Sequence, residues 1–218
     1  AHILDSGADV ITGGNHTFRR REFYEGLDET PYILRPGNYP ASAPGRGLYV
    51  VDKGRYQLAV INLIGLVYME PLACPLMGNV YLDEHLACPF RTLDTLLKTP
   101  DLPKICIVDF HAEATAEKKA LAYYADGRIS ALFGTHTHTQ TADEQILPDG
   151  TGFLTDVGMI GPKRSVLGVR PDQSIAKMKD KLPVRFATAD GPCRMDAVLL
   201  ELDDKTGRTA HISRLQIE

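Results

Sequence analysis

Short apolar runs rich in β-branched residues alternate with amphipathic segments along the first two thirds of the chain, and this alternation constrains the fold most. The runs have the length of strands and cover residues 9–14, 57–65, 104–110, 129–134, 152–158, 184–189, 196–202 and 211–217. Helices are predicted over residues 17–27, 90–98, 114–125 and 171–182. A hairpin is expected across Lys53 and Gly54, and apart from the helix at 171–182 the last third contains only strand patterns. The sequence therefore predicts a layered α/β fold, in which mixed sheets pack together and helices lie outside.

Size and charge limit what such a fold can bind. The chain has 218 residues, of which 44% are hydrophobic, so one domain over residues 1–218 can bury a core. Its net charge of −4 predicts no broad cationic surface for DNA, RNA or acidic lipid. No apolar segment is long enough to span a bilayer, and the first residues lack the pattern of a signal peptide. Together with cysteines that form no CxxC pair, these features predict a cytoplasmic protein with reduced thiols.

Histidines follow three of the predicted strands. His136 and His138 stand in GTHTH after residues 129–134, His111 stands in DFHAE after residues 104–108, and Asn15 and His16 stand in GGNH after residues 9–12. In an extended segment, residues i and i+2 point to the same side, so His136 and His138 can share one small volume. Polar loop histidines are the alternative for each cluster taken alone.

The strand ends are where ligands bind in open α/β sheets, because the crevice beyond the carboxyl ends collects side chains from several strands. Imidazole is the commonest metal-binding side chain in proteins. Three histidine clusters at three strand ends therefore favour a metal or catalytic site over three unrelated surface positions.

The combination of these motifs resembles the calcineurin-like metallophosphoesterases, and within them the bacterial YmdB-like 2′,3′-cyclic-nucleotide phosphodiesterases. Beyond GNH, the matching segments are DFHAEAT, GTHTHTQTAD, RPGNYP, TDVGMIGP and LPVRFATADG, in that order. The resemblance implies a four-layer α-β-β-α sandwich of two mixed sheets. It also implies a small-molecule phosphoester substrate, in this family a cyclic nucleotide.

The resemblance further implies a dinuclear metal centre. Asn15, His111 and His136 would bind one metal, His138 would bind the other, and His16 would remain off the metals as a proton donor. Two cations about 3.5–4 Å apart clamp phosphate oxygens and stabilise an in-line displacement at phosphorus. The ligand types suit iron or manganese, and zinc is also compatible.

Two motifs of the family have no counterpart in the sequence. These are a G-D motif and a G-E-N motif, whose Asp and Glu ligate and bridge the metals in the family, so an N-terminal β-α-β unit is expected to be absent. The alternative to an enzyme is thus a non-catalytic fragment or a regulatory protein with an incomplete metal site. A third interpretation, an amidohydrolase-type site built on HxH, gives GNH and DFHAE no role. Apolar faces left by an absent unit would resemble an interface, so a homo-oligomer is also compatible with the sequence.

Smaller expectations concern side chains near these motifs. Arg35, next to Pro36, is a candidate substrate contact, with an ordinary surface residue as the alternative. Gly13 and Gly14 are expected either to let the backbone approach the metals or to form a tight turn. Asp109 is expected to orient an imidazole, and Glu113 and Asp156 to be supporting residues. Hydrogen bonds to loop backbone are expected for Thr135, Thr137 and Thr139. A position on a solvated helix face is expected for Lys118 and Lys119.

Overall fold

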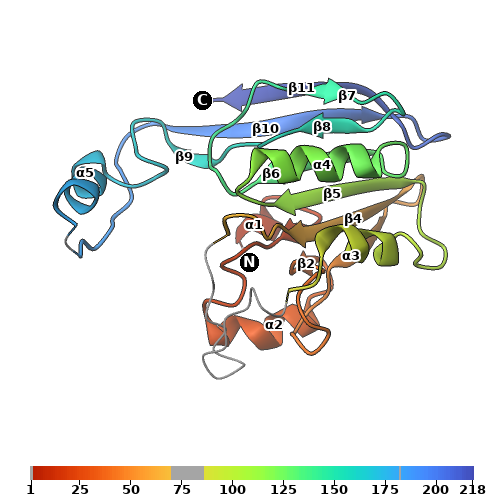
Figure 1. The fold of residues 1–218 in the computed structure, drawn as a ribbon, viewed down its shortest axis with the longest axis horizontal. Coiled ribbons are helices and arrows are strands. Elements are labelled where there is room, and N and C mark those ends of the chain that lie inside the picture. The colour runs from red at the N-terminus through yellow and green to blue at the C-terminus, as the bar shows by residue number, and fades with distance from the viewer. Residues whose placement is uncertain (1, 70–85, 182) are drawn as a thin grey trace.

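The computed structural model describes residues 2–69, 86–181 and 183–218, and it has an α/β fold around a mixed sheet (Figure 1). The sheet has the strand order β3-β4-β5-β6-β8-β7. Strands β4, β5, β6 and β8 are parallel, and β3 and β7 pair antiparallel at the two edges. The strands are β3 (Leu48–Asp52), β4 (Gln57–Ile64), β5 (Ile105–His111), β6 (Ala131–Thr135), β7 (Gln145–Ile146) and β8 (Gly152–Leu154).

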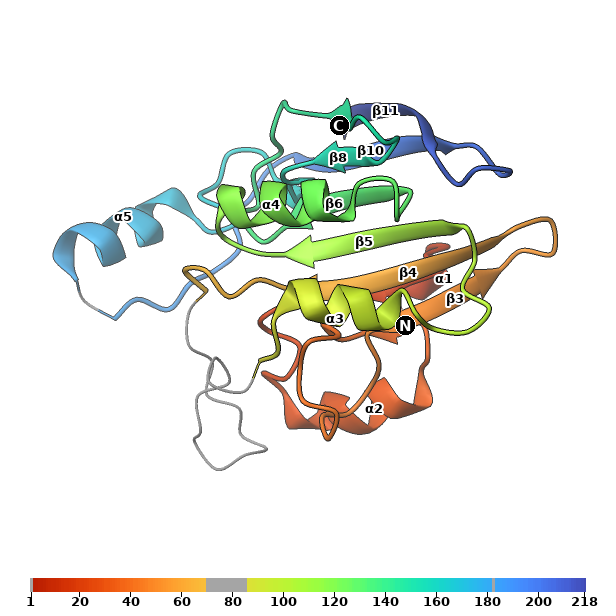
Figure 2. The same ribbon diagram turned by 45° about the vertical axis from the view of Figure 1, so that its right-hand side comes forward.

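Two smaller sheets accompany it in the described residues. Strands β9 (Ile160–Pro162), β10 (Cys193–Leu202) and β11 (Thr209–Ile217) form an antiparallel sheet that runs beside β7 and β8 (Figures 1 and 2). A parallel pair is formed by β1 (Ile11–Thr12) and β2 (Ile33–Leu34). The predicted α/β fold and mixed central sheet are confirmed, whereas the sheet of β9, β10 and β11 is antiparallel throughout.

Helices α3 (Pro89–Leu96) and α4 (Thr115–Ala125) cover one face of the central sheet (Figure 2). Leu93 of α3 and Leu121 of α4 are fully buried in a cluster with apolar side chains of β4 to β6. Such burial is the main stabilising contribution to a core of this kind, because it removes large apolar areas from water. The strand ends that carry the histidines are thus fixed by a rigid, packed sheet.

The opposite face carries the N-terminal elements. These are α1 (His2–Asp5), the short 3-10 helix η1 (Arg21–Phe23) and α2 (Tyr24–Glu29), together with β1 and β2. Phe18, Tyr24, Leu27 and Tyr39 form a second buried cluster with Ile64 at the end of β4. Helix α5 (Pro171–Asp180) lies apart from the sheets at the end of a long excursion between β9 and β10 (Figure 1).

Three sequence predictions differ from these elements. The strand predicted at 184–189 is wrong, because its only ladder contact is a single bridge between Thr188 and Val169. The helix predicted at 17–27 begins only at Tyr24, since the Thr17 hydroxyl bonds the Gly14 backbone and holds the preceding residues in a turn. The strand predicted at 9–14 is limited to β1. The Gly13 N–H donates to the side chain of Asn62 at 3.1 Å instead of continuing a ladder.

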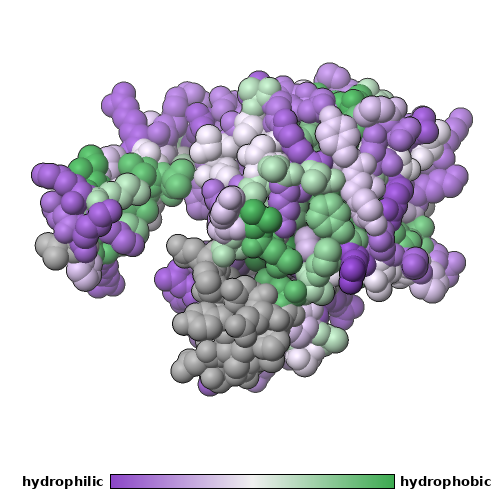
Figure 3. Space-filling view, in the orientation of Figure 1, coloured by the Kyte–Doolittle hydropathy of each residue, from purple (hydrophilic) through white to green (hydrophobic). Residues whose placement is uncertain are grey.

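The excursion that carries α5 leaves apolar side chains at the surface, visible in Figure 3 as green patches on and beside that helix. Ile160, Leu167, Ile175, Met178 and Phe186 are each at least 45% exposed. No helix among residues 2–69, 86–181 and 183–218 is long and apolar enough to cross a membrane. Three of the cysteines, Cys88, Cys106 and Cys193, are free thiols, and Cys74 lies outside the described residues.

Candidate metal centre

The ends of β5 and β6 bring two histidines together. The two strands are parallel and their register pairs His111 with Thr135, so His136 follows directly beside His111. Their rings lie edge to face with centroids 4.9 Å apart. Nε2 of His111 is 3.1 Å from Nδ1 of His136 and 3.1 Å from Oδ1 of Asn15. The predicted meeting of the three strand ends is therefore confirmed for Asn15, His111 and His136.

Hydrogen bonds on the far side of each ring fix its orientation. The Thr135 hydroxyl donates to Oδ1 of Asp109 at 2.8 Å, so its oxygen accepts from Nδ1–H of His111 at 3.0 Å. Nε2 of His136 lies 3.1 Å from Oε2 of Glu113 and donates its hydrogen there. These assignments follow from the bonding network. With both hydrogens engaged outward, the facing nitrogens of His111 and His136 each present a lone pair.

Three potential ligand atoms thus lie together, namely the facing nitrogens of the two imidazoles and the amide oxygen of Asn15. Ligand atoms bound at about 2.0–2.1 Å with octahedral angles are separated by about 3 Å, which matches the 3.1 Å spacings from Nε2 of His111. The described residues contain no group of three His, Cys, Asp or Glu side chains placed to hold a metal ion. The amide oxygen of Asn15 and the two imidazoles together fit a cation. Metal-binding histidines commonly donate their other ring N–H to a neighbouring acceptor, as His111 and His136 do here.

Burial keeps both imidazoles in the neutral form that can ligate. Desolvation, with a further contribution from the neighbouring His136, lowers the pKa of His111 to about 3. Desolvation also lowers the pKa of His136, against the opposing effect of Glu113. Burial raises the pKa of Asp109 to about 6, although hydrogen bonds from Thr12 and Thr135 favour its charged form.

His138 lies beside this cluster and has different surroundings. Its side chain is exposed and borders a cavity of about 500 Å³ whose walls include Met159, Leu167, Val169 and Phe186. The segment is not extended, because His136 has φ 103° and His138 has φ 62°. The expectation that both imidazoles project from one extended strand is therefore wrong in its geometry. The two rings remain near enough for the charge of His138 to act on the pKa of His136.

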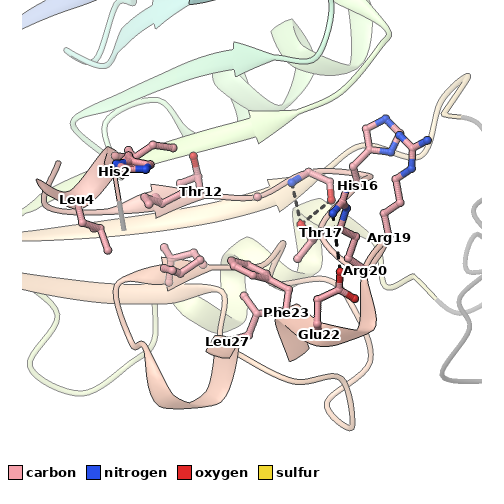
Figure 4. Close-up of a pocket in the computed structure, with 16 residues that line it drawn as sticks. His2, Leu4, Thr12, His16, Thr17, Arg19, Arg20, Glu22, Phe23 and Leu27 are labelled. Atoms are coloured by element: carbon pink, nitrogen blue, oxygen red, sulfur yellow. Dashed lines mark hydrogen bonds and ion pairs between the residues drawn. The ribbon is translucent and has the colours of Figure 1, made fainter. Parts of the chain in front are cut away.

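His16 is exposed and follows Asn15 in the turn that leads out of β1. Figure 4 shows it beside Arg19 at the rim of a second cavity, of about 820 Å³, and shows the bonds that close the turn between Gly14 and Thr17. Its charge lies close enough to contribute to the pKa of His111. His16 is thus near the cluster, with its side chain accessible to a ligand.

Gly14 allows the close approach of β1 and β5. A Cβ atom at this position would lie 2.4–2.6 Å from three atoms of the His111 ring, so a side chain here would force the ring to shift. A Cβ at Gly13 would lie 2.3 Å from the Thr17 hydroxyl. Close approach to the His111 ring explains Gly14, and the tight turn explains Gly13.

Arg35 is buried within its own loop. Its guanidinium donates to the carbonyl oxygens of Pro36 at 2.9 Å and Pro40 at 3.5 Å, and desolvation lowers its pKa. The alternative of an ordinary surface residue is wrong, since only 7% of Arg35 is exposed. These bonds shape the loop between Pro36 and Pro40, and a role in substrate contact stays a prediction.

Two expectations about supporting residues are corrected. Lys118 is fully buried and pairs with Asp156 at 2.8 Å, whereas its neighbour Lys119 is partly exposed as predicted. Thr135 bonds the side chains of Asp109 and His111 rather than loop backbone. The sequence did carry a pattern for Lys118, because it shares the buried helical stripe of Leu121, Ala122 and Ala125.

Comparison with known proteins agrees with this arrangement. The family model described as YmdB-like protein matches residues 1–215. This chain belongs to the YmdB-like protein family. It is 43% identical over 215 residues to the 2′,3′-cyclic-nucleotide 2′-phosphodiesterase of Bacillus subtilis (strain 168), a match that covers 99% of this chain and 76% of that protein.

Solved structures of similar proteins share the fold of this YmdB-like chain. A protein from Thermus thermophilus aligns with a TM-score of 0.86 and 36% identity, covering 99% of this chain and 78% of that one. A structure described as a novel phosphatase from Mycoplasma pneumoniae aligns with a TM-score of 0.84 and 30% identity, covering 99% and 74% of the two chains. The relatives whose activity is named are thus phosphoester hydrolases.

Proposed function

We propose that this chain is a metal-dependent phosphodiesterase that hydrolyses 2′,3′-cyclic nucleotides. The observation that carries the proposal is the close approach of Asn15 Oδ1 and His136 Nδ1 to Nε2 of His111, each at 3.1 Å, at or beyond the ends of β1, β5 and β6. Similarity to a named 2′,3′-cyclic-nucleotide 2′-phosphodiesterase supports the substrate class. Manganese and iron suit the imidazole and amide ligands, and zinc is also compatible.

In this proposal Asn15, His111 and His136 hold one cation and His138 contributes to a second. Bound cations would supply positive charge toward the phosphoryl oxygens of an anionic diester. The neutral imidazoles and their outward bonds to Thr135 and Glu113 support this role, because they present lone pairs inward.

His16 is proposed as the general acid. Hydrolysis of a cyclic diester needs a proton on the departing ribose oxygen, and an imidazole within reach of the phosphate can donate it. The exposed side chain of His16, next in sequence to Asn15, supports this role. The cavity beside His138 offers apolar walls that suit a nucleobase, and this supports a nucleotide over a small diester.

The decisive experiment compares turnover with metal binding in three forms of the 218-residue chain. Hydrolysis of 2′,3′-cyclic AMP would be followed by chromatography, and manganese binding by calorimetry. We expect His16→Ala to reduce turnover by about 10²–10⁴-fold with manganese affinity nearly unchanged, and His111→Ala to abolish both. Equal loss of binding and turnover in His16→Ala would refute the proton-donor role.

The wild-type protein decides between enzyme and binding protein. Turnover with manganese, iron or zinc supports the phosphodiesterase. Tight binding of manganese and of the cyclic nucleotide without turnover under any of the three metals would overturn it and indicate a regulatory protein.

A further inference from the structure

The ammonium of Lys118 reaches through the core to the end of β6. Its side chain and that of Asp156 are both 0% exposed, and Nζ lies 2.8 Å from Oδ2 of the carboxylate. Lysine is almost never fully buried unless it is paired. A Cβ at Gly134 would lie 2.7 and 2.9 Å from Cδ and Cε of Lys118, so the aliphatic stem passes directly against the backbone of β6. The pair therefore lies immediately beneath the segment that carries the two histidines.

Asp156 is bonded to the backbone between those histidines. Its Oδ2 accepts from the N–H of Thr137 at 3.1 Å, and its Oδ1 accepts from the N–H of Gly158 at 2.9 Å. The N–H of Asp156 donates to the hydroxyl of Thr141 at 2.9 Å, while Thr141 N–H donates back to the Asp156 carbonyl oxygen at 3.1 Å. Lys118 thus completes a network in which one buried carboxylate ties residue 137 to the loop at residues 156–158.

The turn held in this way has an unfavourable backbone conformation. His136 and His138 both have positive φ, which is costly for residues with a side chain and persists only where surrounding structure imposes it. The bond from Thr137 to Asp156 lies between the two residues and restrains the backbone on both sides of Thr137. A pair that served core stability alone would not need a bond to this backbone position.

We propose that Lys118 and Asp156 are positioning residues that fix the turn of His136 and His138, so that His136 faces His111. Their relevance to catalysis rests on the function proposed above. The carboxylate supplies the acceptor for Thr137, and the ammonium of Lys118 pairs with that carboxylate and holds it in place in the core.

The test uses the double variant Lys118→Met/Asp156→Asn in the full chain. Removing one charge alone would leave the other buried without a partner and endanger folding, whereas neutralising both preserves shape and avoids that penalty. Thr137 and Gly158 bond different oxygens of Asp156, and an asparagine amide has an acceptor oxygen on one side only, so it cannot serve both N–H groups as the carboxylate does. We expect the Thr137 amide to exchange with solvent at least about tenfold faster and manganese to bind about 10–100-fold more weakly. Exchange at Leu132 in β6 should change less than twofold.

Lys119→Met is the matched control. Lys119 is the next residue of α4, and its pair with Asp143 is longer, at 3.7 Å, and partly exposed. In this variant we expect the rate of amide exchange at Thr137 and the affinity for manganese to stay within twofold of the wild-type values. Thermal stability lost in the double variant, with both quantities unchanged, would overturn the proposal.

The two readouts also separate this proposal from the proposed function. If the wild-type chain binds none of manganese, iron and zinc, the metal-dependent function fails, and amide exchange at Thr137 then decides the positioning role by itself. Faster exchange confined to the turn supports it. Uniform acceleration through β6 overturns it, because that pattern indicates a general loss of core stability.

Discussion

The carboxylate of Glu113 lies 3.1 Å from Nε2 of His136 and fixes the outward side of a ring whose other nitrogen faces His111. Glu113 follows β5, whereas His136 follows β6, so the contact joins two neighbouring strand ends. Half of the Glu113 side chain is buried and 48% is exposed. Its contribution to folding is therefore expected to be small, and its effect should appear in the orientation and basicity of the imidazole.

Glu113→Ala should weaken manganese binding by about tenfold, because an outer hydrogen-bond partner orients a ligating imidazole. The melting temperature should change little, since the carboxylate is half exposed. Calorimetric titration with manganese and thermal denaturation of the same samples measure the two effects. Glu201→Ala, an exposed position on β10, is the control. Equal manganese affinity in wild type and Glu113→Ala would contradict the assigned role.

Gly14→Ala should displace the His111 ring, because the new methyl carbon would lie 2.4–2.6 Å from its atoms. We expect manganese affinity to fall at least about tenfold, with the sheet intact by circular dichroism. Gly26→Ala in α2 is the matched control, as no atom lies within 4 Å of its added carbon. Alanine there should leave binding unchanged and stabilise the helix by about 0.5–1 kcal/mol. Similar affinities in the two variants would show that His111 can move away without cost to the site.

The central sheet could be predicted because each of its long strands is visible as a continuous apolar run in the sequence. Apolar runs at 57–65 and 104–110 became β4 and β5 almost unchanged, since buried parallel strands are continuous apolar segments. Residues 184–189 have a similar composition but only one bridge, because no neighbouring strand offers them a ladder. Whether a segment finds a strand to pair with depends on the tertiary fold, which the composition of that segment does not determine.

The residues of the candidate site could be predicted from the sequence, whereas the side chains that hold them in place could not. Asn15, His111 and His136 could be placed together because each follows a strand, and parallel strands end at one edge. Lys118 is buried against Asp156, which is 38 residues away, and the turn with positive φ at His136 is bonded to the same carboxylate through Thr137. Such side-chain networks form between segments that are distant in sequence, so a local pattern cannot reveal them.

Thr135→Val should destabilise the fold while preserving its shape. Valine is similar in size, but it removes the hydroxyl that joins Asp109 to His111, and leaving a buried polar group without its partner costs about 1–3 kcal/mol. Urea unfolding measures the loss. Thr139→Val, at an exposed position of the same segment, should change stability by less than about 0.5 kcal/mol. An equal, small effect at both positions would show that the Thr135 hydroxyl is not part of a tight network.

Cys106 predicts a specific loss of stability at high pH. The thiol is 2% exposed between core strands, and burial raises its pKa to about 12. In the unfolded chain it ionises near about 8.5. Because the folded-state pKa is the higher one, the stabilisation is fully present below about pH 8.5 and is lost as the pH rises toward 12, by up to about 1.4 kcal/mol per pH unit.

Denaturant unfolding of wild type and Cys106→Ala at pH 8 and pH 10 isolates this thiol from other groups that titrate in the same range. Truncation to alanine costs packing energy at both pH values, so the pH-dependent part of the difference belongs to Cys106. We expect the stability advantage of wild type to shrink at pH 10. Iodoacetamide at pH 8 should modify the exposed Cys88 and Cys193 and leave Cys106 unmodified. An advantage that is equal at both pH values, or rapid modification of Cys106 in the folded protein, would show that this thiol reaches solvent and ionises normally.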